Sequence, residues 1–166
     1  VKQAVNSTER KKVLLESLSK LKFSSEFELP LDQRMVVKEL IVEKCKYMDS
    51  KKQPLWLVWK NAESIGKPIL VIFKVGDDLR QDVLTLQVIR IFDKLWKNEG
   101  LDLLLQPYGC IATGDEIGMI EVVKNADTTA NINKAAGGTK AVLKPATLTK
   151  WLKKHNPTPE LFEKAQ

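Results

Sequence analysis

The fold follows from residues 69–96, which read Ile69-Leu-Val-Ile-Phe-Lys-Val-Gly-Asp-Asp-Leu-Arg-Gln-Asp-Val-Leu-Thr-Leu-Gln-Val-Ile-Arg-Ile-Phe-Asp-Lys-Leu-Trp96. The first five residues are a continuous apolar run, which is typical of a strand buried on both faces. Because side chains alternate along a strand, Leu70, Ile72 and Lys74 are expected on one face. Gly76 ends this strand, and a long helix is predicted to follow it. The segment therefore predicts a core strand that ends in a lysine beside a glycine turn.

The predicted helix is apolar on two sides. At about 100° per residue, one stripe and much of the opposite side are apolar. The stripe consists of Leu84, Val88, Ile91 and Leu95, and the opposite side of Leu79, Val83, Leu86, Ile89 and Trp96. A helix of this kind is expected to pack between layers. Its start is predicted at Asp77 and Asp78, which offer capping oxygens, with Gln81 completing a capping box.

Asp82 is the anomaly of this helix, because it points between Leu86 and Ile89 on an apolar side. A desolvated carboxylate is costly unless a cation or several donors accompany it, and the nearest candidate in sequence is Lys74. Two interpretations stay open. The pair is either structural, with Asp82 favoured by the helix dipole, or it faces a phosphate-binding cleft.

The composition is that of a globular protein, with 43% hydrophobic and 29% charged residues. The length of 166 residues suits one domain or a piece of a larger protein. The first residue is Val1 rather than Met, which suggests an excised segment, and no signal peptide is expected because the N-terminus has no apolar segment. No apolar run approaches the roughly 20 residues needed to span a bilayer.

Cysteine content and charge narrow the class of protein further. Cys45 and Cys110 do not make a disulfide framework, so both are expected to be reduced in a cytosolic protein. One histidine and no paired cysteines argue against a zinc site.

The net charge is +6, and residues 124–166 hold eight lysines against three acidic residues, a net of +5. Without interleaved aromatics, nucleic acid is not an expected partner, while a lipid-facing and a solvated basic face stay open.

The remaining pattern predicts an α+β fold, a mainly antiparallel sheet of about five strands with one long helix against it. A first helix is predicted at 7–21, capped by Ser7 or Thr8, with an apolar stripe of Leu14, Leu15, Leu18 and Leu21 that is expected to dock on another part of a parent protein. Extended segments are predicted at 27–30, 40–48, 54–59, 69–73, 103–107, 109–113 and 117–123. Residues 49–54 form a polar hairpin tip, and Gly100 marks the end of the long helix. Further helices are predicted to start in 127–133, at Pro145 and at Glu160.

Three motifs carry a family resemblance. They are Lys51-Lys-Gln-Pro-Leu-Trp-Leu57, Val71-Ile-Phe-Lys-Val-Gly-Asp-Asp-Leu-Arg-Gln-Asp-Val-Leu-Thr-Leu-Gln87 and Pro107-Tyr-Gly-Cys-Ile-Ala-Thr-Gly-Asp-Glu-Ile-Gly-Met-Ile-Glu-Val-Val123. In order and spacing, roughly residues 40–163 resemble the catalytic subunits of the phosphoinositide 3-kinases, most closely class I and gamma-like. The resemblance implies a protein-kinase-like N-lobe and hinge at 26–123. A linker or docking helix at 1–25 would precede it, and the truncated start of the C-lobe at 124–166 would follow.

The resemblance also implies site residues. Lys74 would be the catalytic residue that contacts the ATP phosphates, with Ser50, Lys51 and Lys52 of the tip as further phosphate contacts. Asp82 would line the inner pocket together with Tyr108. The adenine slot would be walled by Met48, Pro54, Trp56, Ile72 and Ile120, and adenine would be held by the backbone carbonyl of Glu121 and the amide of Val123. For the apolar wall residues, a simple core role stays open.

The chain also departs from the family pattern. The tip has no glycine, and the Asp-Arg-His…Asn catalytic loop and the Asp-Phe-Gly metal-binding motif are absent, so no metal ligand is expected here. The only histidine, His155, is expected to be an exposed helix-end residue. The fragment alone is therefore expected to be inactive, whereas its parent would use ATP and Mg²⁺ on a phosphoinositide lipid.

The implied parent is a cytoplasmic protein recruited to the membrane, with the rest of the kinase domain and regulatory subunits as partners. A non-catalytic lobe that binds a nucleotide or a partner, a phosphoinositide 4-kinase and a protein kinase of related fold remain as alternatives.

Overall fold

The computed structural model describes residues 6–23, 25–138 and 146–165. The chain forms two compact units, residues 1–122 and 123–166. Within the described ranges, no helix is both long enough and apolar enough to cross a membrane.

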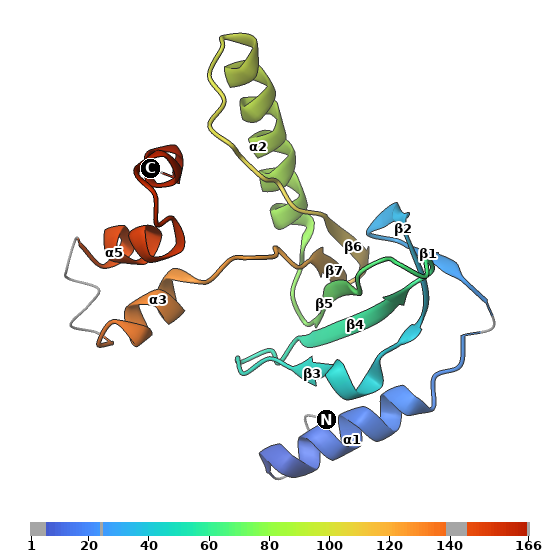
Figure 1. Ribbon diagram of the computed structural model, residues 1–166. Coiled ribbons are helices and arrows are strands. Elements are labelled where there is room, and N and C mark those ends of the chain that lie inside the picture. Colours follow the sequence, from blue (N-terminus) through green and yellow to red (C-terminus); the bar gives the residue numbers. More distant parts are fainter. Residues whose placement is uncertain (1–5, 24, 139–145, 166) are drawn as a thin grey trace. The chain divides into compact units, whose positions relative to one another are not determined.

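The first unit contains an antiparallel sheet with the strand order β1-β2-β4-β5-β7-β6, and β3 pairs with β4 (Figure 1). The strands are β1 (Phe27–Leu29), β2 (Asp32–Leu40), β3 (Lys46–Tyr47), β4 (Leu55–Asn61), β5 (Ile69–Val75), β6 (Cys110–Gly114) and β7 (Ile117–Glu121). The strand of continuous apolar residues, β5, lies between β4 and β7, and its Val71 is fully buried. An antiparallel sheet with one long helix confirms the predicted α+β, kinase-like N-lobe class, with seven strands in the described sheet where about five were expected.

The helices are α1 (Ser7–Ser19), a 3-10 turn η1 (Val42–Lys44), α2 (Arg80–Asn98), α3 (Thr129–Ala135), α5 (Ala146–His155) and α6 (Pro159–Ala165). The helix predicted at 7–21 is confirmed, but its cap is Asn6, whose side chain accepts a hydrogen bond from the Glu9 N–H. The helix predicted from Pro145 is present from Ala146, and Pro145 itself lies outside the described residues. In the second unit, Thr128 caps α3 and Ile132 is buried.

The core of the first unit joins α1 to the sheet. Its buried residues are Leu14, Leu18, Leu29, Val37, Cys45, Leu57, Val58, Trp59 and Val71. Leu14 and Leu18 are 2% and 7% exposed, so two members of the α1 stripe pack within this chain. These two residues of the stripe therefore dock the helix on the sheet that follows it in the same chain. Leu21, at 53% exposure, lies outside the core.

Two predicted strands are wrong. Instead of one strand over 40–48, β2 ends at Leu40, η1 follows, and β3 spans only two residues. The segment 103–107 forms neither a helix nor a strand, although Leu103, Leu104 and Leu105 are apolar. Leu104 has a φ of +52°, which lies in the left-handed region and is incompatible with a strand.

The long helix α2 begins later than its sequence suggested. The N-cap position is Leu79, without a side-chain capping bond, and the predicted Asp77 and Asp78 caps are therefore wrong. Asp78 instead accepts from the Arg80 N–H and pairs with the Arg80 guanidinium at 2.7 Å. The predicted stop is confirmed, because Gly100 has a φ of +78° and the Leu101 N–H closes the helix on the Trp96 carbonyl at 2.8 Å.

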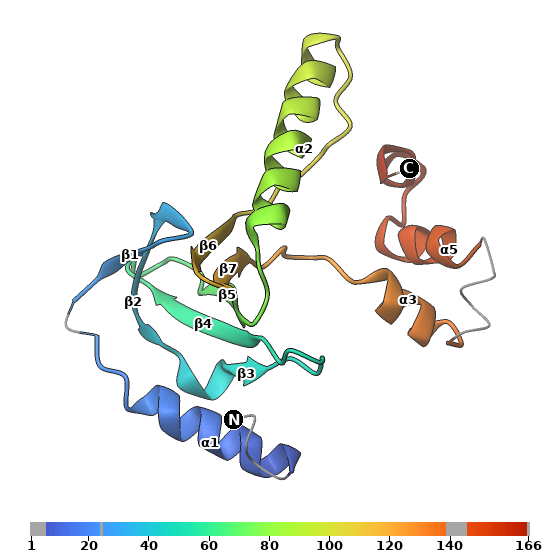
Figure 2. The same cartoon turned by 180° about the vertical axis from the view of Figure 1, so that it is seen from behind.

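Most of α2 is open to solvent in the described chain. Its N-terminal half lies beside β6, and the rest extends beyond the sheet (Figures 1 and 2). Leu86 is the buried residue of the helix. All four residues of the predicted stripe are exposed, namely Leu84, Val88, Ile91 and Leu95. The expectation that this helix packs between two layers is therefore wrong for the described residues, which cover only one of its sides.

Candidate functional site

Three of the expected adenine-wall residues form a row across the sheet. Trp56 of β4 lies opposite Ile72 of β5, and Ile72 lies opposite Ile120 of β7. Cys110 of β6 continues the row, opposite Ile120. Directly opposed residues of antiparallel strands point to the same face, and Lys74 shares this face because it follows Ile72 by two residues. The sheet therefore brings an apolar row and the Lys74 ammonium group to one surface. Lys46 of β3 also lies on this face, because it is opposite Trp56 and its Nζ lies 5.2 Å from the centre of the Trp56 ring.

Lys74 has a different acidic partner from the one considered in the sequence. Its Nζ lies 2.9 Å from the carboxylate of Asp77, and the two side chains are 26% and 29% exposed. Asp82 is an exposed residue at the start of α2. The expectation that Asp82 is desolvated is therefore wrong, and the cation that was to accompany it is paired with Asp77. Sequence analysis missed Asp77 because it was assigned to the helix cap.

Although Lys74 and Asp82 do not form an ion pair with each other, the charges of both shift the pKa of the Cys110 thiol. Burial raises the pKa of Cys110 above its ordinary value of 9.0, the charge of Asp82 raises it further, and the charge of Lys74 lowers it. Cys110 is half-buried at the end of the apolar row. The surface that carries Lys74 therefore also carries a neutral thiol within the electrostatic reach of both side chains.

The predicted hairpin tip is confirmed, since β3 pairs with β4 and the Met48 N–H donates to the Pro54 carbonyl at 2.8 Å. Ser50, Lys51 and Lys52 are exposed on the tip, and Pro54 is buried at its base. The Lys52 ammonium donates a hydrogen bond to the carbonyl of Gly76. The tip is thereby tied to the turn that follows Lys74.

Gly118 is a position to which no role was assigned from the sequence. It lies opposite Lys74 on β7 and is buried. A Cβ at this position would lie 2.4 Å from the Ile111 carbonyl oxygen and 2.5 Å from Leu79 Cδ1. A glycine inside a strand often marks such a close approach. Here it lets Leu79, which is 1% exposed, seat against the sheet beside Lys74.

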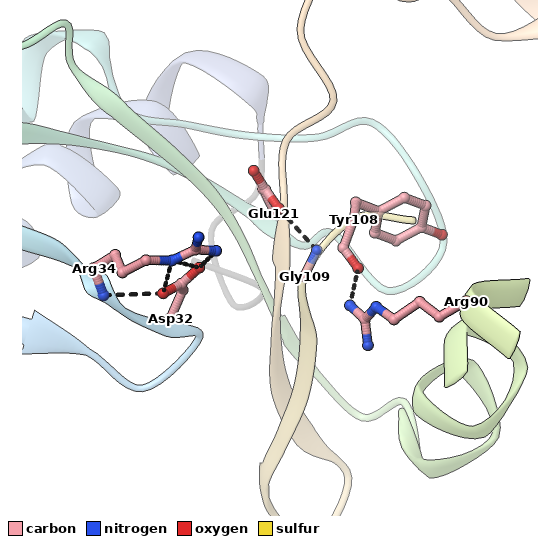
Figure 3. A network of polar contacts seen from close by, with 6 residues as sticks. All are labelled: Asp32, Arg34, Arg90, Tyr108, Gly109 and Glu121. Carbon is pink, nitrogen blue, oxygen red and sulfur yellow. Dashed lines mark hydrogen bonds and ion pairs between the residues drawn. The ribbon is translucent and has the colours of Figure 1, made fainter. Parts of the chain in front are cut away.

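The end of β7 and the start of β6 are held by polar contacts (Figure 3). The Gly109 N–H donates to Glu121 Oε2, and the Glu121 N–H donates to the Gly109 carbonyl, both at 2.8 Å. The half-buried Tyr108 accepts a hydrogen bond at its carbonyl from the Arg90 guanidinium of α2 at 3.2 Å. The Glu121 side chain thus fixes the backbone next to Tyr108. Val123 is 45% exposed and is the first residue of the second unit.

Comparison with known proteins identifies the family. Residues 68–166 match the family described as Phosphatidylinositol 3- and 4-kinase. The chain belongs to this family. It is 66% identical over 165 residues to Phosphatidylinositol 3-kinase 2 of Dictyostelium discoideum, an alignment that covers 99% of this chain and 9% of that protein.

Two further relatives agree with this assignment. Phosphatidylinositol 3-kinase 1 of Dictyostelium discoideum is 51% identical over 95% of this chain and 10% of its own length. Phosphatidylinositol 4-phosphate 3-kinase C2 domain-containing subunit alpha of Pongo abelii is 41% identical over 99% of this chain and 10% of its own length. The chain spans about a tenth of the length of these relatives.

Membership of the phosphatidylinositol 3- and 4-kinase family gives the Lys74 surface a chemical context. A kinase uses ATP, and an apolar row beside an ammonium group suits a purine base joined to phosphates. In the second unit, His155 is exposed at the end of α5, as expected, and its ring is tilted against that of Trp151 with 4.6 Å between the ring centres. The described residues contain no group of three or more His, Cys, Asp or Glu side chains that could hold a metal ion.

Proposed function

We propose that this chain is the ATP-binding part of a phosphatidylinositol 3-kinase of the class I, gamma-like type. Its full polypeptide transfers the γ-phosphate of ATP to the 3-hydroxyl of a phosphatidylinositol lipid. The observation that carries the proposal is the row of Trp56, Ile72 and Ile120 on the face that also presents Lys74. The three relatives are named as 3-kinases, which supports the 3-hydroxyl of the lipid as the proposed phosphate acceptor.

In this proposal, each part of the site has one task. The apolar row, with Met48 and Pro54 at the base of the hairpin, receives the adenine. Lys74 neutralises the charge that develops on the transferred phosphoryl group. Ser50, Lys51 and Lys52 of the tip donate hydrogen bonds to the phosphates. Asp82 and Tyr108 line the inner end of the pocket, and the Glu121 carbonyl and the Val123 amide hydrogen-bond the adenine.

The proposed reaction needs more than this chain. Mg²⁺ accompanies ATP and neutralises part of the phosphate charge, and no ligand of this ion is assigned to the described residues. The catalytic loop and the Asp-Phe-Gly motif are not among the 166 residues. The isolated chain is therefore proposed to be inactive. The full protein is proposed to act in the cytoplasm and at the membrane surface, where the lipid lies, with regulatory subunits.

The test is ATP-dependent phosphorylation of phosphatidylinositol vesicles by the full-length polypeptide, wild type beside Lys74→Met. Lys60→Met is a matched control, because Lys60 is an exposed β4 lysine that pairs with Glu39 at 3.2 Å. Product phosphorylated at the 3-position, lost in Lys74→Met and retained in Lys60→Met, is the expected result.

Two other outcomes favour the alternatives. Product at the 4-position would favour a phosphoinositide 4-kinase, which the matched family also includes. Bound nucleotide without any lipid product would favour a non-catalytic lobe. The proposed inactivity of the isolated chain is tested in the same assay, where lipid product from the purified 166 residues would contradict it.

A further inference from the structure

Lys52 lies on the exposed hairpin tip but is bonded to a different element. Its ammonium donates to the carbonyl oxygen of Gly76, which follows Lys74 by two residues. A Cβ built on Gly76 would lie 3.4 Å from Lys52 Nζ and 3.6 Å from Lys52 Cδ. The end of the lysine side chain therefore lies against the turn between β5 and α2, and is not free in solvent.

Gly76 is held firmly from its other side. Its N–H donates to the Glu116 carbonyl in the β6–β7 turn at 2.7 Å. Its φ of +89° is a conformation that glycine adopts without strain. Three residues later, Leu79 is 1% exposed against the sheet. Because the turn is anchored in this way, the bond from Lys52 fixes the position of the tip and not that of the turn.

The tip itself is held mainly by short local bonds. The Ser50 N–H donates to the Met48 carbonyl at 3.0 Å, and the Gln53 N–H donates to the Ser50 carbonyl at 3.1 Å. Residues 49–52 are exposed. A segment with exposed backbone bonds and few buried contacts opens at low free energy. The hydrogen bond from the Lys52 ammonium to the anchored Gly76 carbonyl therefore contributes a large share of the free energy that holds this tip against the β5–α2 turn.

We propose that Lys52 is a positioning residue that works as a latch. In the nucleotide-free protein, its bond to the Gly76 carbonyl closes the tip onto the β5–α2 turn. When a nucleoside triphosphate binds, its phosphate oxygens accept the hydrogen bond from the Lys52 ammonium, and the bond to the Gly76 carbonyl breaks, which opens the latch. A phosphate oxygen is the better acceptor, because a hydrogen bond between two ionised groups is shorter and stronger than one to a neutral carbonyl. The opening step rests on the function proposed above, whereas the closed state does not.

The closed state is tested in the nucleotide-free, full-length polypeptide by hydrogen–deuterium exchange of residues 48–54. Lys52→Met should speed exchange roughly threefold to tenfold, as expected for the loss of one solvent-exposed hydrogen bond. Lys51→Met, on the same tip, and Lys52→Arg, which keeps a charged donor, should leave exchange within about twofold of wild type. Equal exchange in Lys52→Met and wild type would overturn the latch.

The opening step is tested by comparing ATP with adenosine, which has no phosphate. Lys52→Met should weaken ATP binding roughly threefold to thirtyfold and leave adenosine binding within about twofold, because only phosphates compete for the ammonium. Equal weakening of both ligands, or of neither, would overturn this step. Failure of the wild type to bind either ligand would overturn the proposed nucleotide site and the opening step with it, while the exchange experiment would still decide on the closed state.

Discussion

The ammonium of Lys74 lies 2.9 Å from the carboxylate of Asp77, three residues further along the chain. The neighbouring carboxylate, Asp78, has a different partner, the guanidinium of Arg80 at 2.7 Å. Hydrogen bonds from Arg80 lower the pKa of Asp78 from its ordinary value of 3.8 to about 2. Two adjacent acids in one turn therefore have separate tasks: Asp77 orients the lysine at the end of β5, and Asp78 holds the arginine that begins α2.

This division of tasks predicts unequal effects of two matched substitutions. Asp77→Asn should lower kcat/KM for lipid phosphorylation by the full-length polypeptide roughly tenfold to a hundredfold, because a small misplacement of a positioned group is costly. Asp78→Asn should change it less than about threefold, since exposed ion pairs contribute little. Steady-state kinetics with ATP as the varied substrate check both variants. Equal losses in the two variants would show that the Lys74–Asp77 pair has no special role.

The site could be predicted from the sequence where local rules decide the geometry. Alternation along β5 placed Ile72 and Lys74 on one face, and the strand pairing adds Trp56 and Ile120 to that face. Glycine chemistry predicted the end of α2, which closes at Gly100 in the left-handed region. The alternation along β5 and the end of α2 depend on interactions within a few residues of each other, whereas the pairing that adds Trp56 and Ile120 does not.

The failures come from competing local bonds and from contacts made at a distance. Asp78 was predicted to cap α2, but its carboxylate is taken by Arg80. The strand β2 was missed because charged residues interrupt its apolar pattern, so its pairing with β1 and β4 determines it. Asp77 pairs with Lys74 at the end of β5, and Gly118 makes room for Leu79 against the sheet. Both contacts depend on how the β5–α2 turn folds back on the sheet, which the periodicity of the sequence does not predict.

Gly118 and Gly114 offer a test of the close approach between Leu79 and the sheet. Gly118→Ala should destabilise the β6–β7 hairpin by about 1–3 kcal/mol, because the added methyl would overlap the Ile111 carbonyl and Leu79. At Gly114, the nearest atom to an added Cβ is 3.8 Å away, so Gly114→Ala should cost less than about 1 kcal/mol. Exchange of residues 110–121 in the full-length polypeptide measures both. Similar exchange in the two variants would contradict the predicted overlap.

The packing of α1 within this chain predicts a contrast along its leucine stripe. Leu14→Ala and Leu18→Ala should each destabilise the first unit by about 2–5 kcal/mol, because both side chains are buried and leave cavities. Leu21→Ala, at a 53% exposed position, should cost less than about 1 kcal/mol. The readout is hydrogen exchange of β2 and β4 in the full-length polypeptide. If the three variants behave alike, the buried stripe does not stabilise the sheet.

The thiol of Cys110 predicts opposite effects of the two charges that act on it. Burial and Asp82 raise its pKa above 9.0, and Lys74 lowers it. Below that pKa, alkylation follows the thiolate fraction. Asp82→Asn should therefore speed alkylation and Lys74→Met should slow it, because the first removes a charge that raises the pKa of the thiol and the second removes one that lowers it. Peptide-level mass spectrometry of the full-length polypeptide, at several pH values up to 9, checks this. Cys45 is 1% exposed and serves as the unreactive internal reference. Changes in the same direction for both variants would mean that altered packing, and not charge, governs the thiol.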